Sequence, residues 1–290
     1  VMHISIPKMV YDNTRTSPPS NLIGGQIGIS GGNIKVASAI TTATSNGHLA
    51  LLTGGNIAID AALTVGGTSA TNNLTLRGSG ASSAITQSAA IKTAGLELLG
   101  LTATYTLTHT GNDVKKLAAD TQTISLTIYQ SFAIDTVNTV GLTTSGTTSL
   151  NSTSAATQTQ RIAASGLELL GAGGTYTLSN AANSVNTLAA NTGSVNYANA
   201  SALTVSTVNT TDGITATGNV SIKTLSGDIT LSKNITTTGT VNLEAAGAIV
   251  RTAGTVTAGT LNVKAGSAIG SAGGRVQTNV DYLSADAGDD

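Results

Sequence analysis

The chain has 290 residues, a formal net charge of −1, 9% charged side chains, 34 glycines, one phenylalanine, no tryptophan and no cysteine. The low charge and the lack of a basic stripe exclude a polyanion-binding protein, so we expect no nucleic-acid partner. The absence of cysteine excludes disulfides and thiolate metal sites, and the scarcity of aromatic side chains predicts a narrow core filled by aliphatic residues.

Residues 1–23 differ from the rest of the chain. This stretch holds all three prolines and both methionines, and it shows no repeating register. We therefore expect a non-repetitive N-terminal arm or cap at 1–23, followed by a repetitive domain at 24–290.

Short alternating segments begin soon afterwards, at residues 32–36 (GNIKV), 55–59 (GNIAI) and 73–76 (NLTL). In each, polar and apolar residues alternate after a Gly or Asn, which is typical of a short β-strand following a turn. Gly, Thr, Asn and Val are weak helix formers, so helix is disfavoured.

A duplication occupies the middle of the chain. The sequence GLELLG stands at 95–100 and again at 166–171, and the similarity covers about 83–153 and 154–224, through Val137-Asn138 against Val208-Asn209. Self-similarity at a fixed period predicts a stacked array. Apolar residues also recur every 17 or 18 positions, which suggests four coils in each 71-residue unit and one inner column made of Leu96, Val114, Phe132 and Leu150.

The register continues downstream. Two ladders keep a slightly longer, nearly constant step, one through Val220, Val241 and Leu261 and the other through Ile229, Ile249 and Ile269. An antiparallel sandwich has shorter turn spacings and needs no such register. We therefore predict an all-β chain folded as a right-handed parallel β-helix, a solenoid with coils of about 18–21 residues. Residues 282–290 (YLSADAGDD) end in small and acidic residues without a capping helix.

Paired carboxylates are the first catalytic possibility. Glu97 and Glu168 occupy the same place in the two copies, but four coils would separate them by about 19 Å, whereas glycoside cleavage needs roughly 5–10 Å. A second cluster, Asp113, Lys115, Lys116 and Asp120, is either a site or a solvated turn, and the second copy lacks these charges.

Other motifs are weaker. Gly28-Ile-Ser30-Gly-Gly32 has the spelling of a nucleophile elbow, which requires a strand, a turn and a helix. His3, His48 and His109 lack metal-ligand spacing. The aspartates Asp60, Asp228, Asp286, Asp289 and Asp290 form no calcium-binding nonapeptide repeat. Thr-x-Thr pairs at 104–106, 121–123, 157–159 and 175–177 suggest an ice-binding face with one coil missing. We expect no enzyme activity, no catalytic, cofactor-binding or metal-binding residues, and no cofactor.

A family resemblance is carried by the segments GNIKV, GDITL, GLELLG, TYTL, LAANTGSV, ALTVSTVN and GITATGNVSI. In these segments the chain resembles the β-helical repeat region of filamentous-haemagglutinin-like proteins of the two-partner-secretion type. The resemblance covers residues 24 to 282. It implies a protein of Gram-negative bacteria that crosses the outer membrane through a dedicated secretion partner and acts extracellularly, at the cell surface, as an adhesin or fibre. The family's N-terminal secretion motifs are not found here.

The expected function is that of an exported, non-catalytic structural and adhesive rod that presents a wall rich in Thr, Ser and Asn, with a host or cell-surface glycan as a possible partner. The alternative is a self-assembling extracellular filament. Its subunits would join end to end, to copies of the chain or to the remainder of a longer β-helix, through open strand edges and the N-terminal arm. A further alternative is a β-helical enzyme acting on polysaccharides.

Overall fold

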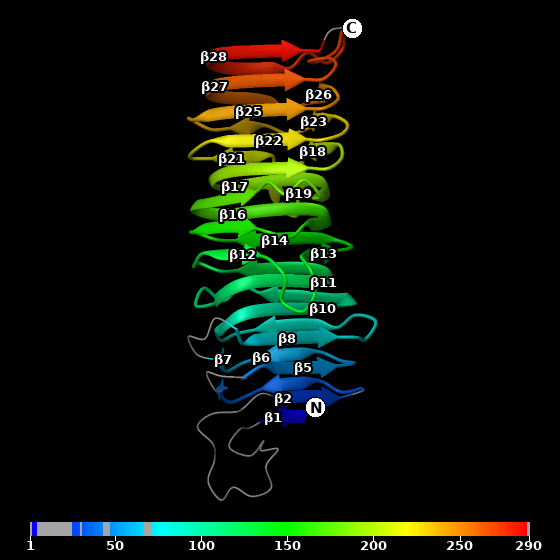
Figure 1. Ribbon diagram of the computed structural model, residues 1–290, viewed down its shortest axis with the longest axis vertical. Coiled ribbons are helices and arrows are strands. Elements are labelled where there is room, and N and C mark those ends of the chain that lie inside the picture. Colours follow the sequence, from blue (N-terminus) through cyan, green and yellow to red (C-terminus); the bar gives the residue numbers. More distant parts are fainter. Residues whose placement is uncertain (1, 5–24, 30, 43–46, 67–70, 289–290) are drawn as a thin grey trace, which may run out of the picture. The chain divides into compact units, whose positions relative to one another are not determined.

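The computed structural model describes residues 2–4, 25–29, 31–42, 47–66 and 71–288. Within these residues the protein is all-β and contains no helix. The chain divides into two compact units, Val1–Ser145 and Gly146–Asp290. In each unit, short strands stack in parallel coils to form a β-solenoid (Figure 1), as the sequence predicts.

The first unit contains thirteen described strands, and two of them bend across several faces of the coil. The strands are β1 Met2–Ile4, β2 Gly25–Ile29, β3 Ile34–Val36, β4 Ile40–Thr41, β5 Leu49–Thr53, β6 Ile57–Ile59, β7 Leu63–Val65, β8 Asn73–Gly78, β9 Ala84–Gln87, β10 Ile91–Leu107, β11 Asp113–Thr127, β12 Phe132–Ile134 and β13 Leu142–Thr144.

The second unit contains the remaining strands. They are β14 Thr147–Asn151, β15 Ala155–Gln158, β16 Ile162–Leu178, β17 Ser184–Asn199, β18 Leu203–Val205, β19 Thr207–Val208, β20 Thr211–Asp212, β21 Ile214–Ala216, β22 Val220–Thr224, β23 Ile229–Leu231, β24 Ile235–Thr236, β25 Thr240–Ala245, β26 Ile249–Arg251, β27 Thr255–Ala265 and β28 Gln277–Ala287.

Columns of aliphatic side chains fill the interior of each unit. In the first unit, strand pairing aligns one residue from each of β5, β8, β10, β11 and β12, and all five are fully or almost fully buried: Leu49, Leu74, Leu96, Leu117 and Ile134. Burial of each such side chain contributes about 1.5–3 kcal/mol. The composition predicts a core filled by aliphatic residues, but Tyr105, Tyr176 and Tyr197 are also fully buried, so the interior is aliphatic for the most part and not throughout.

The downstream ladders are confirmed in the second unit. Val220 pairs with Val241 and Val241 with Leu261, while Ile249 joins Ile229 to Ile269. Elsewhere the step between paired residues varies more widely: it is shorter from Leu117 to Ile134 and longer from Ile57 to Ile85. The right-handed sense of the coils stays a prediction.

The predicted 18-residue column is wrong. Leu96 lies beside Leu117, and Val114 lies beside Thr93. A coil carries buried residues on more than one face, so a constant 18-residue spacing can link side chains on different faces. In the second unit, the steps between the successive layers of Tyr176, Val195 and Val220 are 19 and 25 residues, both longer than the predicted 17 or 18, whereas the step from Val220 to Val241 is the one predicted. A 71-residue unit thus spans little more than three coils, not four.

The two chain ends also add strands. Within the predicted arm, residues 2–4 form β1 and pair with β3 in parallel, while residues 5–23 lie outside the described residues. Residues 282–287, in the small and acidic stretch at the end of the predicted repetitive domain, belong to β28, which pairs with β27 over their whole length. Parallel pairing therefore begins within the predicted arm, at β1, and continues through β28.

Buried asparagines hold the turns between coils. Asn112 is almost completely buried, and its Nδ2 donates to the carbonyl oxygens of Leu107 and Thr127 at 3.1 and 3.0 Å. Its Oδ1 accepts hydrogen bonds from the backbone N of Ile91 and from Nε2 of Gln87, both at 2.9 Å. One amide side chain thereby satisfies backbone groups that the bend takes out of the strand ladder.

The duplication preserves this network. Asn183 makes the corresponding four hydrogen bonds in the second unit, with Leu178, Ala198, Ile162 and Gln158.

Replacing Asn112 with Ala is expected to lower the free energy of unfolding by about 3 kcal/mol, because buried backbone groups lose their partners. Urea denaturation followed by circular dichroism measures the loss. Asn279→Ala, at an exposed position of β28, is the control and is expected to change stability by less than about 0.5 kcal/mol. Equal losses in the two variants would contradict the bridging role.

Candidate functional site

Glu97, the first predicted carboxylate, is buried under a loop. It points outward from β10 between the inward Leu96 and Leu98, yet only 3% of its surface is exposed. Its oxygens accept four hydrogen bonds: from Oγ1 of Thr75 at 2.7 Å, from Nδ2 of Asn138 at 2.9 Å, and from N and Oγ1 of Thr139 at 2.8 and 2.7 Å. The carboxylate is therefore enclosed and saturated with donors.

The covering loop comes from residues 135–141, between β12 and β13. It folds back on itself through an antiparallel bridge between Thr136 and Val140 and a hydrogen bond from the N of Val137 to the carbonyl oxygen of Thr139. Glu97 binds residues 41 and 42 positions further along the chain. We call Glu97 and this loop the glutamate clasp of the first unit.

The second unit has its own glutamate clasp. Glu168 is 4% exposed and accepts hydrogen bonds from Nδ2 of Asn209 at 2.8 Å and from Oγ1 of Thr211 at 2.7 Å. Its loop contains the antiparallel hairpin of β19 and β20, and Asn209 adopts a positive φ of 51° at the turn. In both copies the same Glu therefore fixes a loop through an Asn that lies 41 positions downstream.

The glycines of GLELLG explain the rest of the repeated motif. A Cβ on Gly95 would overlap Oδ1 of Asn73 and lie 3.0 Å from Cγ1 of Val137, and one on Gly166 would lie 3.1 Å from Cγ1 of Val208. A side chain at either position would therefore crowd the loop valine, and at Gly95 it would clash first with Asn73. Gly100 and Gly171 have φ values of 121° and 116°, which side chains rarely tolerate. The hexapeptide thus has three roles: its first glycine leaves space for the loop, its glutamate binds the loop, and its last glycine allows the chain to bend.

The enclosure changes the acidity of Glu97. Burial, the largest single effect, raises its pKa, but the hydrogen bonds from Asn138, Thr75 and Thr139 together outweigh it and hold the pKa below the ordinary value of 4.5. A saturated, ionised carboxylate under a loop stabilises structure. It offers no open acid or base to a substrate.

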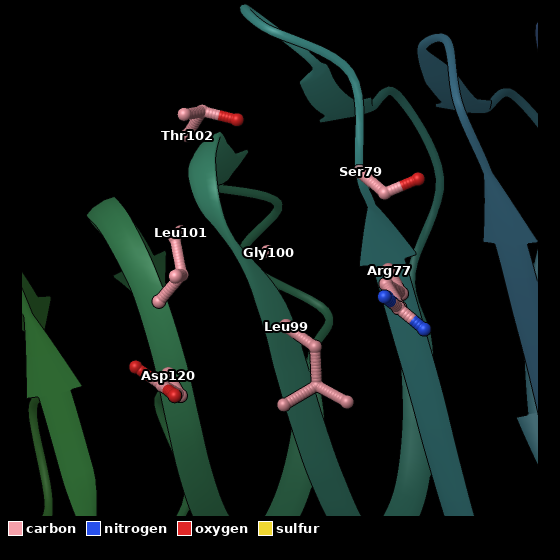
Figure 2. A pocket seen from close by; sticks show the side chains of 7 residues that line it. All are labelled: Arg77, Ser79, Leu99, Gly100, Leu101, Thr102 and Asp120. Atoms are coloured by element: carbon pink, nitrogen blue, oxygen red, sulfur yellow. The ribbon is translucent and has the colours of Figure 1, made fainter.

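An open groove lies on the first unit near the clasp, since Leu99, two residues after Glu97 on β10, lines it. Its volume is about 450 Å³, and it is lined by Arg77, Ser79, Leu99, Gly100, Leu101, Thr102 and Asp120 (Figure 2).

Strand pairing sets the order of the groove residues. Leu99 of β10 pairs with Arg77 of β8 on one side and with Asp120 of β11 on the other. Figure 2 shows Leu99 between the two charged residues and Leu101 on the side of Asp120. The Leu101 side chain is 70% exposed. The groove therefore has a cationic end, an aliphatic middle and an anionic end.

The predicted cluster of Asp113, Lys115, Lys116 and Asp120 does not form one site. Lys115 pairs with Asp113, and Lys116 pairs with Asp135 at 2.8 Å. Asp120 is separate and belongs to the groove. These contacts fit the solvated-turn interpretation for the first three residues only.

The remaining motifs do not come together as sites. Ser30 lies outside the described residues, and the next element is strand β3, so the helix that an elbow requires is missing from the described part. Nδ1 of His48 accepts from the N of Asn73 at 3.1 Å, and Nδ1 of His109 accepts from the N of Gly111 at 2.9 Å. The side chain of His3 lies outside the described residues.

The aspartates and threonines are likewise engaged locally. Asp60 pairs with Lys35, Asp228 accepts from the N of Ala248, and Asp286 lies 3.7 Å from Lys264, while residues 289 and 290 lie outside the described range. No group of three or more metal-ligating side chains occurs among the described residues.

The predicted threonine row is out of register. Thr104 and Thr106 pair with Thr123 and Ser125, and Oγ1 of Thr121 is turned inward to the carbonyl oxygens of Gly100 and Ala103. The described residues also contain no helix long and apolar enough to span a membrane.

Sequence reasoning missed Arg77 and Leu101, because their neighbours in the groove come from other coils and depend on the pairing of β8, β10 and β11. A signal for the clasp was present: Val137-Asn138 and Val208-Asn209 survive in both copies at the same distance from the glutamate.

Replacing Glu97 with Gln is expected to lower the free energy of unfolding by about 2 kcal/mol at neutral pH, because charge-assisted hydrogen bonds become neutral ones. The folded-state pKa of Glu97 lies below 4.5, so its stabilisation is present above that pH and is lost as the pH falls through the folded-state pKa. Urea titrations between about pH 3 and pH 7 measure both effects.

Glu244→Gln is the matched control, since Glu244 pairs with Lys223 at an exposed position and is expected to contribute less than about 1 kcal/mol. If Glu97→Gln destabilised the protein equally at both ends of the pH range, the ionised clasp would be contradicted.

Comparisons with protein-family models, curated proteins and solved structures give no match to this chain.

Proposed function

We propose that this chain is part of an exported, non-catalytic structural and adhesive rod that presents a polar wall to its surroundings. The observation that carries the proposal is the stacking of coils on columns of buried, mostly aliphatic side chains within each unit. Such a fold gains length with each added coil without needing a thicker core. A long fold with few charged side chains is better suited to act as a spacer than as a catalyst.

The outward rows support a repetitive wall. On β25 and β27, Thr240 pairs with Thr260 and Asn242 with Asn262, and Nδ2 of Asn262 donates to Oδ1 of Asn242 at 2.8 Å. Identical neutral residues in successive coils create a regular array of hydroxyl and amide groups. A glycan is a partner that such an array could bind through many weak hydrogen bonds.

The proposal also includes a place in the cell. Export from a Gram-negative bacterium through an outer-membrane partner, with the chain at the cell surface, is supported only by the resemblance of its rungs to those of filamentous-haemagglutinin-like proteins. Antibody labelling of intact, unpermeabilised producing cells tests it. Labelling that appears only after permeabilisation would count against surface exposure.

The enzyme alternative has less support. Asp120 is the one carboxylate among the residues that line the groove, whereas glycoside hydrolysis by the usual mechanism needs two facing carboxyl groups. Glu97 next to it is covered by the loop of the clasp.

Deletion of residues 220–260 is expected to leave a folded, shorter protein. Val220, Val241 and Leu261 occupy equivalent places, so the deletion removes two whole coils and Leu261 takes the place of Val220. Small-angle X-ray scattering is expected to show a maximum dimension shorter by about 10 Å, and circular dichroism should still report β-structure.

Deletion of residues 220–250 is the control, since it removes a non-integral number of coils and shifts inward residues out of register. We expect this variant to lose cooperative unfolding. Equal tolerance of the two deletions would argue against a rod assembled coil by coil.

A second candidate function is a subunit of a self-assembling filament, and β28 favours it. The column Val220, Val241, Leu261 continues to Leu283, which is 58% exposed because no further described coil covers it. The neighbouring Tyr282 is 74% exposed. An uncovered parallel edge with an apolar row is a template for another strand, from a second copy or from the rest of a longer solenoid.

Replacing Leu283 with Lys is expected to reduce self-association, because a charge would have to be buried in the apolar column of the next coil. Sedimentation velocity over a concentration series and negative-stain electron microscopy measure the effect. Ser284→Lys adds the same charge on the opposite face of β28, where Ser284 aligns with Asn262, and is expected to have little effect. Association unchanged in Leu283→Lys would exclude this end as the joint.

A further inference from the structure

The charges in the groove differ from most charges of the protein. Elsewhere in the described part of the chain, six lysines pair with carboxylates, most of them on neighbouring coils, as in Lys35 with Asp60 and Lys223 with Glu244. Arg77 and Asp120 make no ion pair or side-chain hydrogen bond within the described residues, although they share one outer row. Leu99 stands between them.

We propose that this groove is a binding site for a zwitterionic ligand with an aliphatic spacer. The anionic group binds the guanidinium of Arg77, the cationic group binds the carboxylate of Asp120, and the spacer packs on Leu99 and Leu101. This site is independent of the proposed rod, because it needs only the local pairing of β8, β10 and β11.

The dimensions fit such a ligand. Two strand spacings place the backbones of Arg77 and Asp120 about 10 Å apart. A span of this size suits charged groups joined by a short aliphatic chain or by two to three residues of extended peptide. A volume of about 450 Å³ lies within the usual range of small-molecule sites.

The groups at each end determine the ligand's charge. Arg binds carboxylates through two parallel hydrogen bonds, and Asp accepts charge-assisted hydrogen bonds from ammonium or guanidinium groups. A purely anionic ligand, such as an acidic sugar, would gain from Arg77 but meet repulsion from Asp120. Both charges are satisfied together only by a ligand that carries one of each sign.

The duplication supplies a neutral counterpart. In the second unit, Leu170 corresponds to Leu99 and pairs with Asn151 on one side and Asn191 on the other. Ala172 replaces Leu101. The same scaffold therefore exists in this chain without the charges and without the large aliphatic wall, and it serves as a reference within one molecule.

The experiment titrates the full chain, labelled at its leucine methyl groups, with two probes and follows chemical shifts by NMR. The probe 6-aminohexanoate represents a free small zwitterion, and the blocked peptide acetyl-Glu-Leu-Lys-amide represents a segment of a protein partner. We expect shifts at Leu99 and Leu101 and none at Leu170, with a dissociation constant of about 1 mM for the better probe.

The two probes distinguish the sources of the ligand. Tighter binding of the peptide indicates a protein segment, and tighter binding of 6-aminohexanoate indicates a free metabolite-sized zwitterion. Acetyl-Gln-Leu-Gln-amide, which lacks both charges, is the control peptide. Equal binding of this control, tighter binding of glucuronate than of either zwitterion, or no shift with either probe would overturn the proposal.

Charge variants complete the test. Arg77→Asn and Asp120→Asn copy the residue type of the second unit and are each expected to weaken binding about tenfold. The double variant Arg77→Asp with Asp120→Arg exchanges the two ends, so 6-aminohexanoate is expected to bind in the reverse direction within about threefold of the original affinity. All of these positions are exposed, and unchanged signals from the core leucines verify the fold. If the double variant were as weak as the single variants, charge complementarity would not be the basis of binding.

Discussion

Parallel pairing in register is the constraint on which everything else in this protein depends. Each coil has both its backbone groups and its inward side chains satisfied by the coils next to it, so a shift of one residue would turn a buried column outward. The column Leu49, Leu74, Leu96, Leu117 and Ile134 shows how consistently this register is kept although coil length varies. Variation in length is absorbed at the turns and in loops, because only the strands need to match.

Loops that leave the ladder need their own anchors, and the repeated hexapeptide supplies them. Unlike ordinary surface carboxylates, Glu97 and Glu168 are buried and accept hydrogen bonds from Asn and Thr side chains of a loop. A buried, ionised carboxylate is stable only when hydrogen-bond donors surround its oxygens. The buried amides of Asn112 and Asn183 follow the same rule with a neutral group. Polar side chains in this protein therefore stabilise its irregular parts, while aliphatic side chains stabilise its regular ones.

The fold class follows from the sequence because a solenoid is governed by local alternation and by a repeating register, and both are visible in GNIKV, GDITL and the ladder from Val220 to Leu261. The coil boundaries in the duplicated region do not follow from the sequence. Several faces of each coil carry buried residues, so the spacing between two apolar residues does not reveal whether they lie on the same face. Glu97 invites a catalytic interpretation when seen alone, since nothing local reveals the loop that covers it. Arg77 and Asp120 form a pair only once three strands are aligned, and each looks like an isolated surface charge before that.

The close approach of each loop valine to a glycine has a consequence for substitutions. Gly95 and Val137, or Gly166 and Val208, lie far apart in the chain but pack directly against each other. A side chain at Gly166 would push on Val208, and one at Gly95 would push on Val137 and on Asn73 of the neighbouring strand, so either substitution would require the loop to shift. Grafting such a loop onto a different coil would accordingly require transferring three things together: the empty position, the acid two residues after it, and the Val-Asn dipeptide that completes them.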